Sequence, residues 1–129
     1  MNTSERLIYD IKNIQTAATG TNNLRTNKVK PNRIQIVKLI AVENKTTTYT
    51  KLRIGIWDNG VFMPFFEETA PLVGELYFIT DEIILRDGQQ VQAELQGCTA
   101  GDNIEMYVHG RWEPDTWEES GNETNSETP

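Results

Sequence analysis

The stretch TYTKLRIGIWDNGVFMPFFE, residues 48–67, decides the fold. Its first half alternates in period two, which is typical of a β-strand with two different faces. One face would carry Thr50, Leu52, Ile54 and Ile56, and the other Tyr49, Lys51, Arg53, Gly55 and Trp57. The DNG that follows predicts a two-residue hairpin, because Asn-Gly tolerates the positive φ angles of a type I′ turn. In the return stretch, Pro64 lacks a backbone N–H, so we expect an edge strand or a bulge.

Short alternating segments continue on both sides of this hairpin, and turn signals separate them at a spacing of about ten residues. The predicted strands are 7–16, 24–29, 33–43, 48–57, 61–67, 72–79, 82–85, 89–97 and 104–113, with a loop at 19–23. This spacing predicts an all-β fold. We expect a single antiparallel β-sandwich, jelly-roll-like, over residues 1–112.

The character of the chain changes in EPDTWEESGNETNSETP, residues 113–129. This segment has six acids, no basic residue and one large apolar side chain, Trp117. Such a composition cannot bury enough apolar surface to fold alone, so we predict an extended acidic C-terminal arm. A lone tryptophan in this arm is a candidate anchor on a partner.

The chain offers little material for catalysis. It has one cysteine, Cys98, and one histidine, His109, which leaves neither a hydrolase triad nor a multi-histidine metal site. Adjacent acids such as Glu67 and Glu68 face opposite sides of a strand and make poor acid–base pairs. We therefore expect a non-enzymatic protein with no cofactor and no metal, in which Cys98 is a small packed residue.

Membranes and nucleic acids are also disfavoured as partners. No apolar run is long enough to cross a bilayer, and the N-terminal MNTSERLIYDIKN has charges where a secretion signal needs an apolar core. The basic cluster RTNKVKPNR, residues 25–33, could meet phosphates, but no aromatic side chains interrupt it to stack on bases.

Two polar rows are candidate contact faces. In NIEMYVHGRWE, residues 103–113, the residues between the apolar positions include Tyr107, His109 and Arg111. Tyrosine and arginine are enriched where binding energy concentrates in protein interfaces. With the polar row of the 48–57 strand and the arm, the interface candidates are Tyr49, Lys51, Arg53, Trp57, Tyr107, His109, Arg111 and Trp117.

The net charge of −7 is divided unevenly along the chain. Residues 1–53 hold ten basic and three acidic residues, a net +7, whereas residues 54–129 hold two basic and sixteen acidic residues, a net −14. This division allows two interpretations. The subunit could be dipolar and stack on charged neighbours, or strands from the two halves could mix their charges on one surface.

Carbohydrate is the alternative ligand, because Trp57, Trp112 and Tyr49 could form a stacking platform on a β-sandwich. Trp112, however, falls on the apolar row with Ile104 and Met106, so we expect it to close the core.

The paired strands TYTKLRIGIWDNGVFMPFFEE and QQVQAELQGCTAGDNIEMYVHGRW, with the acidic extension that follows, resemble the accessory virion structural proteins of tailed bacteriophages. The resemblance covers about residues 7–112 and is one of layout. It implies a capsid decoration, collar, head–tail connector or tail component that self-associates and docks on other virion proteins. The implied location is the virion, assembled in the host cytoplasm. The alternative remains a carbohydrate-binding or receptor-binding module.

Overall fold

The computed structural model of the chain describes residues 8–115. These residues form nine β-strands and no helix, so no helix is present there that could cross a membrane. The strands are β1 (Ile8–Thr16), β2 (Gly20–Arg25), β3 (Arg33–Asn44), β4 (Lys51–Asp58), β5 (Val61–Thr69), β6 (Tyr77–Ile79), β7 (Ile83–Leu85), β8 (Gln89–Cys98) and β9 (Asn103–Pro114).

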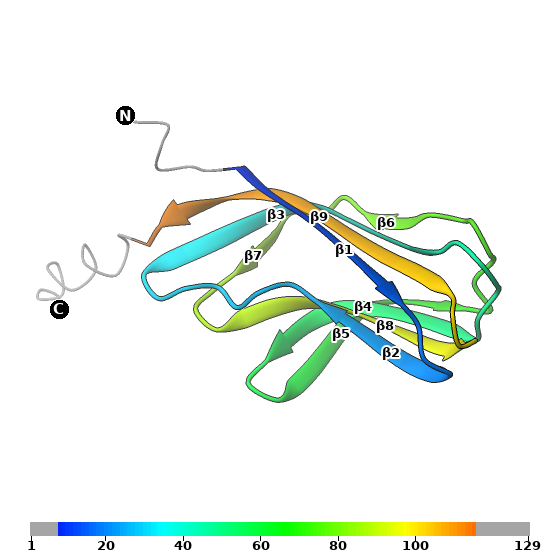
Figure 1. The fold of residues 1–129 in the computed structure, drawn as a ribbon. Helices are drawn as coiled ribbons and strands as arrows, with labels where there is room; N and C mark the ends of the chain where they lie inside the picture. The colour runs from blue at the N-terminus through cyan, green and yellow to red at the C-terminus, as the bar shows by residue number, and fades with distance from the viewer. Residues whose placement is uncertain (1–7, 116–129) are drawn as a thin grey trace, which may run out of the picture.

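The strands form two sheets that face each other (Figure 1). Sheet A has the order β1-β9-β3-β6, with β7 also paired to β3, and sheet B has the order β2-β8-β4-β5. Every pairing between strands is antiparallel. The chain crosses repeatedly between the sheets in the order of a jelly roll, with β6 and β7 sharing the place of one strand. The predicted all-β, jelly-roll-like sandwich is therefore confirmed.

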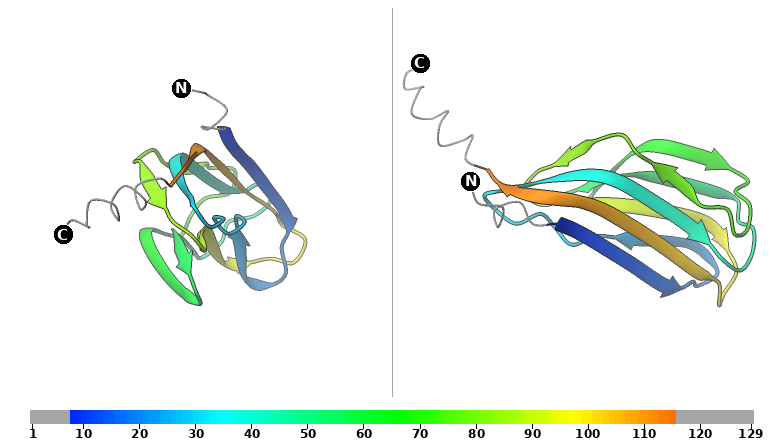
Figure 2. Two further views of the ribbon diagram at one scale, coloured as in Figure 1. Left: turned by 90° about the vertical axis from the view of Figure 1, so that its left-hand side faces the viewer. Right: turned by 90° about the horizontal axis from the view of Figure 1, so that it is seen from above.

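The core lies between the sheets, and Figure 2 shows the two layers from an end and from above. Alternate residues of the central strands point into it, as the period-two pattern requires. Among the fully buried side chains are Ile40 and Val42 of β3, Leu52 and Ile54 of β4, Val91 and Leu95 of β8, and Ile104, Met106 and Val108 of β9. Cys98 is buried in the same cluster as a free thiol, as predicted.

A bulge opposite a glycine shapes each sheet. The β4–β5 register shifts between Ile54 and Gly55, and the β3–β9 register shifts between Val37 and Leu39, opposite Gly110. A Cβ on Gly110 would lie 2.1 Å from the Ile36 carbonyl oxygen, so only glycine lets the backbones approach this closely. The expectation that the strand of Pro64 is an edge strand with an irregular register is confirmed.

The turn at residues 58–60 is the predicted hairpin turn. Asn59 has φ 52° and Gly60 has φ 89°, the left-handed conformations that a type I′ turn demands at both central positions. The hairpin sets the register in which Trp57 pairs with Phe62 and Asp58 with Val61.

Several boundaries differ from the predictions. Residues 19–23 are not a loop, because β2 begins at Gly20, and the buried Asn22 binds the Ala18 backbone through both ends of its amide. The predicted strand 72–79 shortens to β6, since residues 72–75 form a turn in which the Glu75 N–H donates to the Leu72 carbonyl at 3.3 Å. β9 runs two residues past the predicted domain boundary at residue 112, because it stays paired with Arg33 and Ile34 of β3.

A buried polar network closes the end of the sandwich where the 45–50 and 99–102 connections meet. The Asp102 carboxylate is 1% exposed and accepts hydrogen bonds from Asn44 Nδ2 at 2.9 Å, Thr47 Oγ1 at 2.7 Å and the Thr99 backbone N–H at 2.9 Å. Burial acts to raise the pKa of Asp102, but these hydrogen bonds outweigh it and lower the pKa below its usual value. The ionised carboxylate is therefore a structural part of the fold.

Candidate functional site

Exposed apolar side chains gather along one edge of the sandwich. We call this edge, formed by β5, β6, β7 and the connections between them, the open edge. Among residues 16–115, every exposed large apolar side chain lies there, each at least 42% accessible: Val61, Met63, Phe65, Leu72, Val73, Leu76, Phe78 and Ile84. Exposed apolar residues gathered at one edge mark an interaction site more often than isolated ones do.

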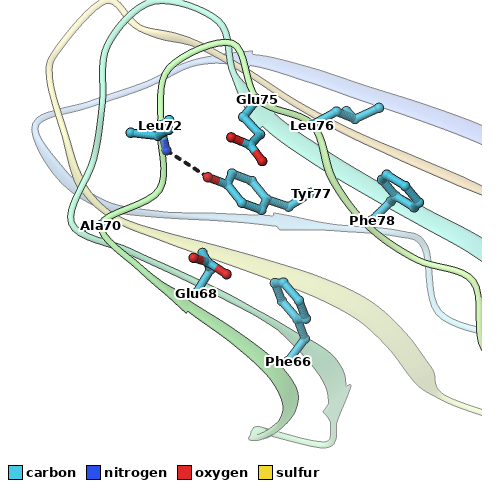
Figure 3. Close-up of a pocket in the computed structure, with 8 residues that line it drawn as sticks. All are labelled: Phe66, Glu68, Ala70, Leu72, Glu75, Leu76, Tyr77 and Phe78. Atoms are coloured by element: carbon cyan, nitrogen blue, oxygen red, sulfur yellow. Dashed lines mark hydrogen bonds between the residues drawn. The ribbon is translucent and has the colours of Figure 1, made fainter.

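A groove of about 530 Å³ lies within the open edge (Figure 3). Its lining comes from β5, β6 and the connection between them: Phe66, Glu68, Ala70, Leu72, Glu75, Leu76, Tyr77 and Phe78. Phe66 and Glu68 pair with the core residues Ile54 and Leu52, so their side chains share the inner face of sheet B. The groove is thus the mouth between the two sheets, at the side where neither sheet has a further strand.

Hydrogen bonds hold the wall of the groove in place. The Leu72 backbone N–H donates to the Tyr77 hydroxyl oxygen at 2.9 Å, which Figure 3 shows as a dashed line. The Gly74 N–H donates to the Asn44 carbonyl at 2.9 Å, and the Ala70 N–H donates to the Thr50 carbonyl at 2.9 Å. The connection between β5 and β6 is therefore tied to the fold, and the groove exists before anything binds.

The lining of the groove combines apolar and acidic residues. Its charged residues are Glu68, which is half-buried, and Glu75, which is exposed. Neither carboxylate forms an ion pair with a residue of the described part of the chain. An apolar lining with a few polar groups is the usual composition of a binding groove, and the charge here favours a basic ligand.

The candidates predicted on β4 lie on the outer face of sheet B. Lys51 Nζ is 3.6 Å from a Glu67 carboxylate oxygen, and Arg53 contacts Glu67 at 3.3 Å and Glu94 at 3.4 Å. These cross-strand pairs satisfy the charges within the subunit. They stabilise the sheet modestly, since the side chains are partly exposed.

The two described tryptophans each have an arginine over the ring. The Arg25 guanidinium lies 3.8 Å from the Trp57 ring centroid, and Arg33 lies 3.9 Å from that of Trp112. Trp112 does not close the core as expected, because it follows the last core residue of β9 and lies at the end of sheet A, half-buried under Arg33. The predicted stacking platform for a sugar is thus covered on one ring face at both positions.

Tyr49 is not an interface residue on the subunit surface. It is 4% exposed and belongs to the core cluster. The strand pattern fails there because β4 begins only at Lys51, so the alternation of faces does not extend to residue 49. Burial raises the pKa of its hydroxyl, which has no hydrogen-bond partner among residues 8–115.

The polar row of β9 lies on the outer face of sheet A. The Tyr107 and His109 rings stack with centroids 6.4 Å apart, and Arg111 Nε donates to Glu113 at 2.9 Å. The structure therefore does not bring the β4 and β9 candidates together, since they lie on opposite outer faces of the sandwich. Trp117 lies outside the described residues.

The uneven charge along the sequence is largely mixed in space. Sheet A places β9 between β1 and β3, and sheet B places β4 between β8 and β5. Ion pairs consequently join basic residues of the first half to acids of the second: Lys38–Glu82, Lys45–Glu105, Lys51–Glu67, Arg53–Glu67 and Arg53–Glu94. For these residues the second of the two interpretations, mixed charges on one surface, is the right one.

Residues 8–115 contain no group of three or more His, Cys, Asp or Glu side chains that could hold a metal ion. Burial raises the pKa of the Cys98 thiol, which makes it a poor nucleophile at neutral pH.

Sequence reasoning missed the groove, although a signal was present. The segments VFMPFFE and LVGELYF carry more large apolar residues than one core-facing row can bury. Phe65 and Phe66 are adjacent, so a strand must expose one of them. Such an excess of apolar residues on an edge strand is the pattern that indicates an exposed apolar surface.

The similarity of this chain to solved structures is weak. No protein-family model and no curated protein matches the chain. A subunit described with Bacillus endospore appendages, a family of disulfide-linked pili, shares 13% identity over 88% of this chain and 94% of that chain, with a TM-score of 0.45. The Drosophila NLP core, described for pentamer formation and histone binding, shares 13% identity over 81% and 96%, with a TM-score of 0.39. A CBM4 structure shares 10% identity over 88% and 96%, with a TM-score of 0.39.

Proposed function

We propose that the chain is a non-enzymatic structural subunit that acts by self-association and by docking on other proteins. In the finer form of this proposal it is a component of a tailed-phage particle, namely a capsid decoration, collar, connector or tail protein. The layout of the sequence supports that finer form. The proposed location is then the virion, assembled in the host cytoplasm.

The open edge is the observation that supports the general proposal of a subunit that self-associates and docks on other proteins. Its exposed apolar residues all come from one stretch of the described chain, Val61 to Ile84, and lie at one side of the sandwich. The strands there are poor templates for backbone pairing, because β6 and β7 have three residues each and β5 contains Pro64 and a bulge. An interface at this edge would therefore rest on side-chain packing, which gives a defined contact without open-ended sheet growth.

The test is the solution mass of the full chain by light scattering over a range of concentrations. We expect a defined oligomer. A variant with Leu72→Ser, Leu76→Ser and Phe78→Ser should be monomeric at concentrations where the parent is assembled. A parent that is monomeric at every concentration and salt would sink the self-association proposal.

A second candidate function, glycan binding, draws on the lining of the groove. Phe66, Tyr77 and Phe78 offer aromatic rings, and Glu68 and Glu75 offer hydrogen-bond acceptors, as a sugar requires. This candidate predicts that the monomer binds an oligosaccharide on a glycan array, and that the Tyr77→Ala variant does not bind it. Absence of binding across the array, with an assembled parent, would exclude this candidate in favour of assembly.

A further inference from the structure

We infer that copies of this chain associate head to tail, the basic loop of one copy entering the acidic groove of the next. The basic loop is defined as residues 26–32, TNKVKPN, between β2 and β3. This inference rests on the proposed function and names the two surfaces through which self-association occurs.

The basic loop presents two lysines on a fixed frame. Lys28 and Lys30 are exposed and flank Val29, which is 2% exposed in the core. The Val29 N–H donates to the Gln89 carbonyl at 3.1 Å, and the Val29 carbonyl accepts from the Gly88 N–H at 2.8 Å. With Val29 anchored on both sides, the two lysines point away from the core, and little conformational freedom is lost when the loop binds.

These lysines form no ion pair with any residue of the range 8–115, in contrast to Lys38, Lys45 and Lys51. Beside the loop, Arg86 and Asp87 carry opposite charges, and the Asp115 N–H donates to the Asn32 carbonyl at 2.9 Å. Lys28 and Lys30 are the charged side chains of the loop itself.

The loop and the groove lie at opposite ends of the sandwich (Figure 1). Backbone hydrogen bonds place Val29 beside Gln89, at the start of β8, and Thr50 beside Gln96 near its end. Thr50 in turn accepts from Ala70 of the groove wall. The β8 backbone from Gln89 to Gln96 is extended, so the two ends are about 23 Å apart. A molecule with complementary surfaces at opposite ends makes a heterologous contact, which yields a ring or a filament.

The chemistry of the two surfaces matches. The lysine stems can lie against Phe66 and Tyr77 while the ammonium groups reach Glu68 and Glu75. Both partners of each new ion pair lack a partner in the described chain, so binding would break no existing pair. Because Glu68 is half-buried, an ion pair that it forms would be partly shielded from water.

The test is a charge-swap series on the full chain, followed by sedimentation velocity over a range of concentrations. The loop variant carries Lys28→Glu and Lys30→Glu, and the groove variant carries Glu68→Lys and Glu75→Lys. Each variant on its own should associate more weakly than the parent, with a rise of at least about tenfold in the dissociation constant. An equimolar mixture of the two variants, and the chain with all four changes, should assemble again, since each acidic surface then meets a basic one.

Two controls match the changes in charge. Arg53→Glu with Arg111→Glu reproduces the charge of the loop variant on the outer faces of the two sheets. Glu94→Lys with Glu105→Lys does the same for the groove variant. Neither control should change assembly. Circular dichroism melting checks that every variant folds, and Glu75→Lys alone, at an exposed position, serves if the half-buried Glu68→Lys does not fold.

The outcomes separate the inference from the function it rests on. Rescue in the mixture and in the fourfold variant would support loop-to-groove contact. If the parent assembles and the loop variant assembles equally well, the loop is not the occupant, and self-association stands through another surface. If the groove variant dissociates and the loop variant does not, another basic segment fills the groove, and the inference fails. A parent that never assembles overturns both.

Discussion

The central strand pairs of the sandwich and its open edge differ in how far their side chains are buried or ion-paired within the subunit. Along β3–β9 and β4–β8 the inner rows are buried, and charged outer residues such as Arg53 find partners across the strands. Along the open edge, Phe78 is 57% exposed and Glu75 has no ion-pair partner within residues 8–115. Groups satisfied inside the subunit stabilise the fold, and unsatisfied groups are available to a partner.

This contrast teaches that folding and association are carried by different residues. Substitutions in the centre should lower the free energy of unfolding and leave the interface chemistry intact. Substitutions of exposed residues at the open edge should leave the free energy of unfolding nearly unchanged and weaken association. Single substitutions at both places test that separation, in order of decreasing effect on stability.

Gly110→Ala should cause the largest loss. The added Cβ would lie 2.1 Å from the Ile36 carbonyl oxygen and 2.9 Å from Val37 Cα, both backbone atoms that cannot move without opening the β3–β9 pair. We expect the free energy of unfolding, measured in urea, to fall by about 3 kcal/mol or more.

Gly101→Ala is the matched control for Gly110→Ala. Gly101 has φ 93°, but a Cβ added there would meet no atom within 4 Å, so the change adds backbone strain without a clash. It should cost about 1–2 kcal/mol. Equal losses in the two variants would show that close approach at the bulge is not what fixes sheet A.

Asp102→Asn should lower the free energy of unfolding by about 2 kcal/mol at pH 7, because a carboxylate that accepts three buried hydrogen bonds is replaced by an amide. Folding lowers the pKa of Asp102, so the unfolded chain binds its proton more readily. The stability due to the ionised form is complete above the unfolded pKa of about 3.9 and is lost as the pH falls through the lower folded pKa.

Urea unfolding between pH 7 and pH 2.5 checks this prediction. The parent should lose stability below about pH 4, and the Asp102→Asn variant should lose less over the same interval. Parallel curves for the two proteins would mean that other carboxylates account for the acid sensitivity and that the network at Asp102 does not.

The sequence predicts the sandwich and little of the site. Period-two alternation in β4, β8 and β9 follows from burial on one face, and Asn59-Gly60 allows only a narrow choice of turns, so these elements could be predicted. The boundary before Lys51 could not, because Tyr49 continues the alternating pattern while its backbone lies outside the strand. Pattern alone does not say where hydrogen bonding to a neighbouring strand stops.

The groove could not be predicted from the sequence for a different reason. It needs β5 and β6 to be the last strands on one side of their sheets, and strand order depends on contacts between residues far apart in the chain. Phe66 and Tyr77 become neighbours in the groove only through that order. The charges show the same limit, since the division between the two halves of the sequence disappears once the strands interleave.

Tyr49→Phe should raise the free energy of unfolding by about 1 kcal/mol, because the change removes a buried hydroxyl that has no hydrogen-bond partner and keeps the ring in the core. Tyr77→Phe is the control, since the Tyr77 hydroxyl accepts the Leu72 N–H and its loss should cost about 0.5–1 kcal/mol. Opposite signs for the two variants would show that the hydrogen bond of each hydroxyl, present at Tyr77 and absent at Tyr49 in the described chain, decides its contribution to stability. A loss on Tyr49→Phe would show that the hydroxyl has a partner in solution.

Phe78→Ser should change the free energy of unfolding by less than about 0.5 kcal/mol, because the ring is 57% exposed on the outer side of a three-residue strand. Phe66→Ser is the control from the same groove. Its ring packs against the core, and its loss should cost about 2 kcal/mol or more. Measured at a concentration where the parent is monomeric, the two values separate folding from association. If Phe78→Ser were as damaging as Phe66→Ser, the open edge would be part of the core, and its exposed residues would no longer argue for a partner.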